Sequence, residues 1–155
     1  MKEDVKDMRT ENVELTVLCL IRRKDEYLLQ ERVSKVWHGV TLPGGHIEPN
    51  ESIIDAVRRE IKEETGLTIY QPHLCGVKQF PIENGRYIVF LFKTDSFDGE
   101  LKDSHEGKMK WVHKDILYKE KLVNDFYELI EVMLNDKLTE FQYVKKNDDW
   151  EIVMK

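Results

Sequence analysis

Hydrophobic and polar positions follow two patterns along the first half of the chain, and each pattern predicts a different element. Apolar residues dominate positions 13–21, and an alternating pattern resumes at 27–32 after a short charged turn, which predicts a β-hairpin. Positions 53–65 instead carry apolar side chains at helical spacing, which is the one-sided stripe of an amphipathic helix. Ser52 precedes this stripe and Gly66 follows it, so the sequence supplies a suitable residue for each helix end.

The second half of the chain predicts further strands and one more helix. The remaining expected elements are extended segments at 67–70 and 73–80, a tight turn at Asn84-Gly85, a strand at 86–94, a polar loop at 95–107, a short strand at 108–112, a helix at 123–134, and a hairpin of strands 139–144 and 150–154. Strands outnumber helices in this order. The pattern therefore predicts an α+β protein in which a mixed sheet is layered with helices.

The segment before the first helix and the polar face of that helix are the most informative part of the sequence. Residues 37–45 contain one proline and three glycines, which predicts an irregular loop. On the helix, Glu60, Glu63 and Glu64 fall within an arc of roughly 100° at the helical repeat. Like charges at this spacing repel one another, so a compensating positive charge is expected.

Two explanations fit this cluster of carboxylates. It could be a solvated helix face that is neutralised by the neighbouring Arg58, Arg59 and Lys62. It could also hold a hard divalent cation, because Mg²⁺ prefers carboxylate oxygens and usually leaves room for substrate phosphates. The glycines nearby would let a phosphate approach the backbone closely.

The spacing of the whole segment favours the second explanation. From Gly45 to Leu67 the residues follow Gly-x5-Glu-x7-Arg-Glu-U-x-Glu-Glu-x-Gly-U, where U is apolar. This segment resembles the Nudix box and matches it at all nine positions. The flanking strand pattern extends the resemblance to about residues 13–134.

The resemblance implies a fold and a chemistry. Nudix proteins have a mixed sheet sandwiched between helices, and they hydrolyse nucleoside diphosphates linked to another group with the help of Mg²⁺ or Mn²⁺. We therefore expect one Nudix-like α/β/α domain over residues 1–155, with a C-terminal hairpin and with residues 1–12 as a leader that frays. The hairpin could cap the sheet or pair with a second chain.

The resemblance also assigns roles to residues of the box. Glu60, Glu63 and Glu64 are expected to be metal ligands, with Glu60 or Glu63 as the candidate for activating water. The carbonyl of Gly44 is expected to complete the metal shell, and Gly44 and Gly45 to lie against the substrate. Arg59 is expected to hold the catalytic face in place. Glu51 is expected to pair with Arg59 and to support it.

Five residues outside the box are further candidates, each with a simpler alternative. Glu106 is expected to be a metal ligand or base, or else a solvated loop carboxylate, and the neighbouring His105 could shuttle protons. Arg32 is expected to contact phosphate, or else to be a surface cation. Trp37 could stack on a base or cover the loop, and Trp111 could stack on a base or pack in the core.

The residues around the box are similar to the MutT-type branch, which removes oxidised nucleoside triphosphates such as 8-oxo-dGTP. The expected reaction is therefore Mg²⁺-dependent hydrolysis of a nucleoside triphosphate to the monophosphate and pyrophosphate. In some oxidised-purine hydrolases, acidic residues follow the tryptophan that corresponds to Trp111. This chain lacks them, which weakens the prediction that the base of the substrate is a purine. ADP-ribose or a dinucleoside polyphosphate is the alternative substrate, and a non-catalytic nucleotide sensor is a second alternative.

Composition narrows the class of protein further. The 155 residues include 24 Lys and Arg against 30 Asp and Glu, a net charge of −6, whereas a binder of duplex nucleic acid normally has a basic surplus. No apolar run is long enough to span a membrane, and the polar start lacks a secretory signal, so we expect a cytoplasmic monomer or homodimer. Cys19 and Cys75 lie in apolar stretches and are expected to be buried, unpaired thiols.

Overall fold

The computed structural model describes residues 9–34, 36 and 38–155. The described strands are β1 Asn12–Arg23, β2 Glu26–Val33, β3 His38–Thr41, β4 Gly44–His46, β5 Thr68–Tyr70, β6 His73–Ile82, β7 Gly85–Thr94, β8 Ser96–Asp98, β9 Gly107–His113, β10 Glu140–Lys146 and β11 Asp149–Met154. The described helices are α2 Ile53–Thr65, the 3₁₀ helix η1 Lys114–Lys119, and α3 Phe126–Leu134.

β1 is the organising strand of a mixed sheet. The strand order is β11-β10-β6-β7-β1-β2-β3, with β4 also paired to β1 and β9 to β2. β1 runs parallel to β7 along most of its length, is antiparallel to β4 at residues 16–18, and pairs with β2 only at its last two residues. β4 and β2 therefore both pair with β1, and the pairing of β4 places Gly44 and Gly45 beside this strand.

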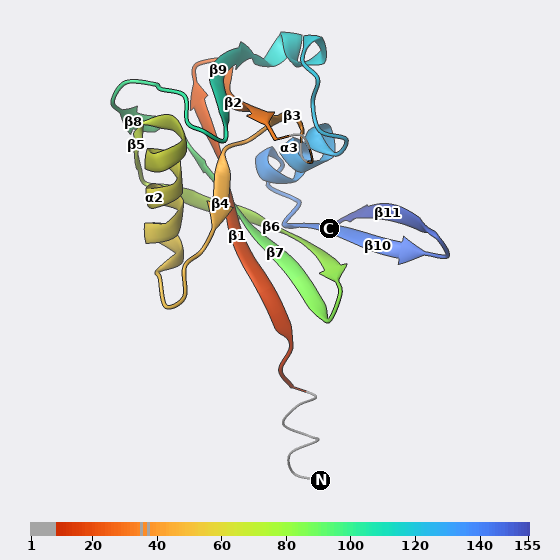
Figure 1. The fold of residues 1–155 in the computed structure, drawn as a ribbon. Coiled ribbons are helices and arrows are strands. Elements are labelled where there is room, and N and C mark those ends of the chain that lie inside the picture. The colour runs from red at the N-terminus through yellow and green to blue at the C-terminus, as the bar shows by residue number, and fades with distance from the viewer. Residues whose placement is uncertain (1–8, 35, 37) are drawn as a thin grey trace.

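Alternation along the strands divides the core into two layers. Val17, Cys19 and Ile21 of β1 pack with α2, whereas Leu20 packs with α3 on the opposite face. The same alternation holds in β2, where Leu28 faces α2, because successive side chains of a strand point to opposite faces. The two helices accordingly lie on opposite sides of the sheet (Figure 1). The expected α/β/α sandwich is confirmed.

Local signals fixed the first helix. Ser52 accepts a hydrogen bond from the backbone N–H of Asp55 at 3.2 Å, which caps the helix start. Gly66 has a φ of +82° and its N–H bonds to the carbonyl of Lys62, a left-handed ending that favours glycine. The predicted bounds of α2 are confirmed.

Three sequence predictions of local structure were wrong. Residues 37–45 were expected to be irregular but contain β3 and β4, because the glycines allow the chain to run directly against β1 and β2. The expected loop at 95–107 contains β8, which pairs with β5 in a separate two-stranded sheet. The second helix begins at Phe126 rather than at position 123, because residues 121–123 are held in a parallel bridge to Val40 of β3.

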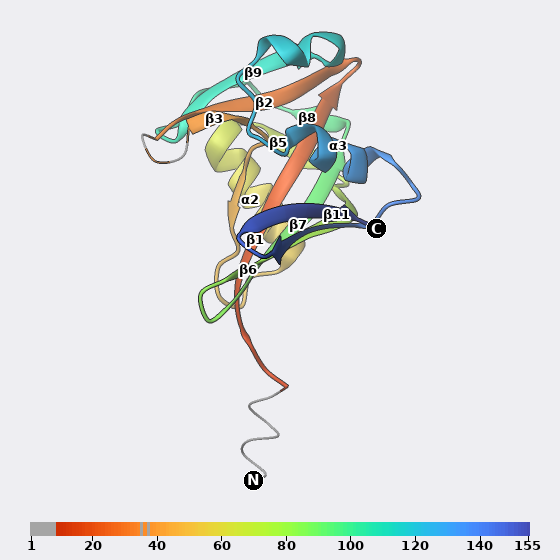
Figure 2. The same ribbon diagram turned by 90° about the vertical axis from the view of Figure 1, so that its right-hand side faces the viewer.

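The C-terminal hairpin belongs to the sheet. β10 pairs parallel to β6, and β11 forms the outer strand. The hairpin projects from the body of the molecule in Figure 1, and Figure 2 looks onto it from that side, where it lies in front of β1 and β7. Phe141 of β10 is fully buried in the core beneath α3. Tyr143 donates a hydrogen bond to Asp125 at 2.5 Å, and Lys78 of β6 pairs with the same carboxylate at 2.8 Å, so a buried polar cluster joins the hairpin, the sheet and the start of α3.

Two further expectations concern the membrane and the cysteines. Within the described part of the chain, no helix has the length and apolar character needed to cross a membrane. Cys19 is fully buried and unpaired, as expected. Cys75 is also unpaired but only half-buried, because it lies where the pairing of β6 with β7 shifts register.

Candidate functional site

The glycine segment brings β4 against the polar face of α2. Gly44 pairs with Leu18 of β1, and Gly45 pairs with Val17. A Cβ atom at position 45 would overlap the carboxylate of Glu60, so only glycine leaves room for that side chain. The box thus packs a helix carboxylate directly against a strand backbone.

Arg59 joins the glutamates of the box. Its guanidinium donates to Glu51 through Nε at 2.8 Å and Nη2 at 2.9 Å, and its Nη1 contacts Glu60 at 3.0 Å and Glu63 at 3.3 Å. Nη2 also donates to the carbonyl of His46 in β4 at 3.0 Å. Arg59 therefore ties the helix to the turn before it and to the neighbouring strand, as predicted for Arg59 and Glu51.

Glu64 occupies a separate, buried environment. Only 4% of the residue is exposed, and its Oε2 accepts hydrogen bonds from Gln30 Nε2 at 2.7 Å and Ser104 Oγ at 3.1 Å. Its carboxyl group also adjoins that of Glu106, and burial and this neighbour both disfavour the charged form of Glu64 and raise its pKa. The structure therefore brings Glu64 and Glu106 together, and separates this pair from the Arg59-linked Glu60 and Glu63.

Burial and charge shift the pKa values of these carboxyl groups in opposite directions. The hydrogen bond from Arg59 lowers the pKa of Glu51 to about 2. Loss of hydration on burial raises the pKa of Glu60, despite its contact with Arg59. Burial and the adjoining Glu106 also raise the pKa of Glu64, because its charged form loses hydration and lies beside a second carboxyl group.

The donor set fits a hard divalent cation. Glu60 and Glu64 are partly desolvated carboxylates, Glu63 is an exposed one, and the backbone of Gly45 in β4 lies against the carboxylate of Glu60. Within residues 9–155, leaving out 35 and 37, no three His, Cys, Asp or Glu side chains converge on one point as a metal cage. The reason is visible in the contacts, since Arg59 holds Glu60 and Glu63 while Gln30 and Ser104 hold Glu64.

The other candidates lie at different distances from this cluster. Arg32 is half-buried on β2, pairs with Gly107 of β9, and is two residues along the same strand face from Gln30. Glu106 precedes that pairing, and 54% of its side chain is exposed. His105 is almost fully exposed beside it. The structure thus brings Arg32 and Glu106 to the edge of the site.

Trp111 is engaged in contacts with other side chains of the protein. Trp111 stacks on Phe97 with ring centroids 5.4 Å apart, and the guanidinium carbon of Arg23 lies 4.3 Å from the Trp111 ring centroid. These contacts, together with its packing against the α2-side core, favour the packing alternative over base stacking. Trp37 lies outside the described residues.

Sequence reasoning missed Gln30 and Ser104. Only 3% of Gln30 is exposed. Its position on β2 shares a strand face with the core residue Leu28. A polar residue at an apolar register of a strand is a signal in the sequence, since burying an amide costs free energy unless it finds a partner. Its partner, Glu64, lies 34 residues away, which only the fold reveals.

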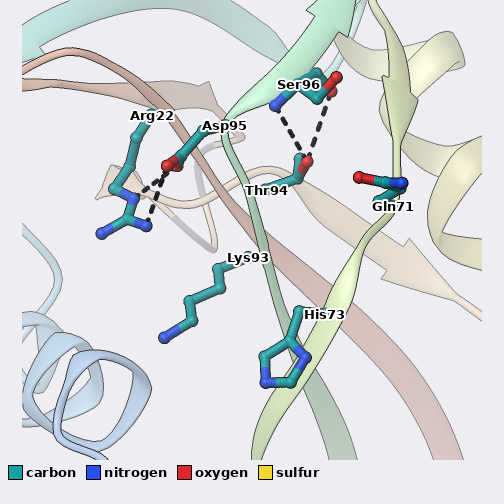
Figure 3. Close-up of a pocket in the computed structure, with 7 residues that line it drawn as sticks. All are labelled: Arg22, Gln71, His73, Lys93, Thr94, Asp95 and Ser96. Carbon is teal, nitrogen blue, oxygen red and sulfur yellow. Dashed lines mark hydrogen bonds and ion pairs between the residues drawn. The ribbon is translucent and has the colours of Figure 1, made fainter.

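A hollow of about 330 Å³ lies elsewhere on the surface, lined by the ends of β1 and β7 and the start of β6 (Figure 3). Its charged groups are already engaged, because Arg22 pairs with Asp95 at 2.7 Å and Lys93 donates to the carbonyl of Met133 at 3.2 Å. None of the box carboxylates lines it. We therefore place the functional site at the box and not at this hollow.

Comparison with known proteins agrees with this placement. The family model for the NUDIX domain matches residues 13–133, which include the whole box. The chain belongs to the Nudix family. In the crystal structure of the mMutator MutT protein from Bacillus halodurans, the Nudix fold superposes with a TM-score of 0.72 at 31% identity, covering 90% of this chain and 94% of that chain.

Two curated Nudix relatives match over shorter segments. The chain is 39% identical over 99 residues to the uncharacterized Nudix hydrolase YvcI of Bacillus subtilis (strain 168), covering 60% of this chain and 61% of that protein. It is 38% identical over 92 residues to the ADP-ribose pyrophosphatase of Methanocaldococcus jannaschii, covering 57% of this chain and 54% of that protein. The matched segments thus span less than two thirds of either relative.

Proposed function

We propose that this Nudix protein hydrolyses a nucleoside triphosphate to the monophosphate and pyrophosphate with a divalent cation, Mg²⁺ or alternatively Mn²⁺. The observation that supports the proposal most directly is the complete box in which Arg59 links Glu51, Glu60 and Glu63 beside Gly45. The MutT protein of Bacillus halodurans matches 90% of the chain and supports the MutT-type branch, for which the sequence resemblance implies an oxidised nucleoside triphosphate.

In this proposal each residue has a defined task. Glu60, Glu63, Glu64 and the carbonyl of Gly44 hold the cation, and Glu106 is a further ligand or base. When bound, such an ion neutralises charge on phosphoryl oxygens and lowers the pKa of a bound water.

The protein's own residues supply the remaining steps of the proposed reaction. Glu60 or Glu63 accepts the proton of the attacking water. Arg59 orients these carboxylates, Glu51 orients Arg59, and Arg32 binds a phosphate at the rim. Gly45, by lacking a side chain, leaves the space that Glu60 and the substrate need.

ADP-ribose is a second candidate substrate, because the relative from Methanocaldococcus jannaschii is named for that activity and is 38% identical over the matched segment. The chemistry at the pyrophosphate linkage is the same for both substrates. The two differ in products, since a triphosphate gives pyrophosphate and ADP-ribose does not.

A substrate panel tests the proposal. Canonical and oxidised nucleoside triphosphates, ADP-ribose and dinucleoside polyphosphates are incubated with Mg²⁺, and pyrophosphate and phosphate are measured separately. We expect pyrophosphate from a triphosphate, and phosphate only after added pyrophosphatase. Turnover that continues unchanged in EDTA would remove the metal from the mechanism.

Variants of the box provide the matched control. Glu63→Gln and Glu60→Gln should each abolish turnover, a loss of at least about 10²-fold for a ligand or base, while the melting temperature stays near that of the wild type because a like charge is removed. If no nucleotide is turned over above the Glu63→Gln background but nucleotides still bind, the protein is a sensor and not an enzyme.

A further inference from the structure

Gln30 is a buried polar residue whose side chain is directed at one oxygen of the box. It lies on β2 with 3% exposure, and its amide Nε2 donates to Glu64 Oε2 at 2.7 Å. The strand face that it shares with Leu28 is otherwise part of the apolar core against α2. A buried amide at such a position costs free energy that its hydrogen bond to a carboxylate offsets.

Ser104, in the loop between β8 and β9, contacts the same oxygen of Glu64. Its Oγ donates to Glu64 Oε2 at 3.1 Å and accepts a hydrogen bond from the backbone N–H of Glu106 at 3.2 Å. The loop that carries Glu106 is thereby tied to Glu64 through one hydroxyl group. Gln30 and Ser104 reach Glu64 across 34 and 40 residues of sequence, so both contacts are products of the fold.

These two donors treat the carboxylate of Glu64 asymmetrically. A carboxylate oxygen has two lone-pair sites, and both sites of Oε2 have a donor. Oε1 accepts neither of these hydrogen bonds, and the carboxyl group of Glu106, which also adjoins Glu64, is itself a candidate ligand. Mutation of a residue that orients a metal ligand in this way typically lowers metal affinity or activity by about 10- to 100-fold.

We propose that Gln30 and Ser104 are positioning residues that hold Oε2 of Glu64, so that Oε1 is the oxygen presented to a divalent cation. This inference rests on the proposed function, and assigns Glu64 the role of a ligand through a single oxygen. Gln30 and Ser104 themselves touch neither cation nor substrate.

The test is Mn²⁺ binding to the nucleotide-free protein, measured from the free-ion signal in electron paramagnetic resonance. Gln30→Met keeps the length and apolar bulk of the side chain but has no donor, and Ser104→Ala removes the hydroxyl. We expect the Mn²⁺ dissociation constant to rise about 10-fold in each variant and up to about 100-fold in the double variant. In steady state kcat should fall by a similar factor, with the nucleotide KM changed by less than roughly two-fold.

Thr94→Val is the control for general destabilisation. Thr94 is likewise buried in the sheet, and its Oγ1 donates to the carbonyl of Tyr70 at 2.6 Å, away from the box. We expect this variant to lower the melting temperature without changing the Mn²⁺ dissociation constant. If Gln30→Met does not fold, the half-buried Ser104→Ala gives the same readout on its own.

The outcomes separate this inference from the proposed function. If the wild-type protein binds no Mn²⁺ and turns over no nucleotide, the proposed function fails and the positioning role fails with it. If the wild type is active and Glu63→Gln is not, but Gln30→Met and Ser104→Ala bind Mn²⁺ as tightly as the wild type, the positioning role alone is overturned.

Discussion

At the residue scale, Arg59 is the centre of charge compensation in the box. One guanidinium faces Glu51, Glu60 and Glu63, and 28% of its side chain is exposed. Removing a cation from partly buried carboxylates leaves their charges uncompensated, and this costs more than the loss of a surface pair. The solvated-face alternative raised by the sequence assigned the compensation to several basic residues, whereas the structure gives it to one.

The first prediction concerns this cation. Arg59→Gln should lower the free energy of unfolding by about 1–3 kcal/mol, less than for a fully buried pair because the site is partly exposed to solvent. Urea denaturation in EDTA measures the change. Arg22→Gln is the matched control, since Arg22 makes a similar two-bond pair with Asp95 at an exposed position and should change stability by less than about 1 kcal/mol. Equal effects in the two variants would contradict the central role of Arg59.

The second prediction concerns the pH dependence set by Glu64. Burial and Glu106 raise the pKa of Glu64 above its ordinary value of 4.5, so the folded protein binds this proton more tightly than the unfolded chain does. Stability from this group is therefore complete below pH 4.5 and is lost as pH rises through the raised folded pKa.

A glutamine at position 64 carries no titrating proton, and its amide can donate a hydrogen bond to the adjoining Glu106. Without metal, Glu64→Gln should therefore melt at least as high as the wild type at pH 7, and its melting temperature should fall less between pH 4.5 and 7. Thermal melts in EDTA across this range measure the effect. A lower melting temperature at pH 7 with an unchanged pH profile would contradict the prediction.

At the element scale, the short strand β4 determines how closely the sheet approaches α2. Its two glycines have different neighbours. A Cβ at Gly44 would overlap the backbone carbonyl of Val17, whereas a Cβ at Gly45 would overlap the side-chain carboxylate of Glu60. The first contact concerns the pairing of strands and the second concerns the site.

The third prediction separates these two contacts. Gly44→Ala should lower the free energy of unfolding by about 1–3 kcal/mol, because a backbone atom must shift. Gly45→Ala should cost less stability but lower kcat by about 10²-fold, because displacing Glu60 by about 1 Å disturbs the reacting geometry. Denaturation and turnover are measured on both proteins. The prediction is wrong if Gly45→Ala keeps wild-type turnover.

The same strand shows where sequence-based prediction was limited at this scale. The helix α2 was predicted with correct ends because Ser52, Gly66 and the apolar stripe act within a few residues. Residues 37–45 were predicted to be irregular because glycine and proline are poor strand formers by themselves. Pairing of Gly44 and Gly45 with β1 overrides that preference, and the pairing partner is about 26 residues earlier in the sequence.

At the scale of the whole molecule, the C-terminal hairpin is part of the hydrophobic core. Phe141 is fully buried beneath α3, whereas Trp150 on the outer strand is 51% exposed. The sequence left open whether this hairpin caps the sheet or pairs with a second chain, and the structure shows that β10 extends the sheet at its edge by pairing with β6. Pairing with a second chain stays a prediction.

The fourth prediction follows from this burial. Phe141→Ala should lower the free energy of unfolding by about 3–5 kcal/mol, the usual cost of removing a buried aromatic side chain. Trp150→Ala should cost less than about 1 kcal/mol, since half of the residue is already in contact with solvent. Denaturant titration of both variants measures the difference. A similar loss in both would mean that the hairpin is stabilised mainly through its exposed strand.

The sequence by itself determined the helix of the box, its two ends, the face on which Glu60, Glu63 and Glu64 lie, and the family resemblance that their spacing carries. All of these depend on short-range geometry, in which positions three and four apart meet on one side of a helix. The family resemblance also implied the pairing of Arg59 with Glu51, which lies eight residues earlier, just before the helix begins.

Only the tertiary structure decided which side chains hydrogen-bond to each carboxylate of the box. Arg59 binds Glu60 and Glu63, whereas Glu64 has other partners. Gln30 and Ser104 reach Glu64 from positions 34 and 40 residues away in the sequence, and Trp111 packs on Phe97. Such contacts depend on strand order and register, which side-chain alternation along one segment does not encode. The physical reason is that helix faces are set locally, whereas burial and hydrogen bonding between distant segments arise only when the whole sheet is assembled.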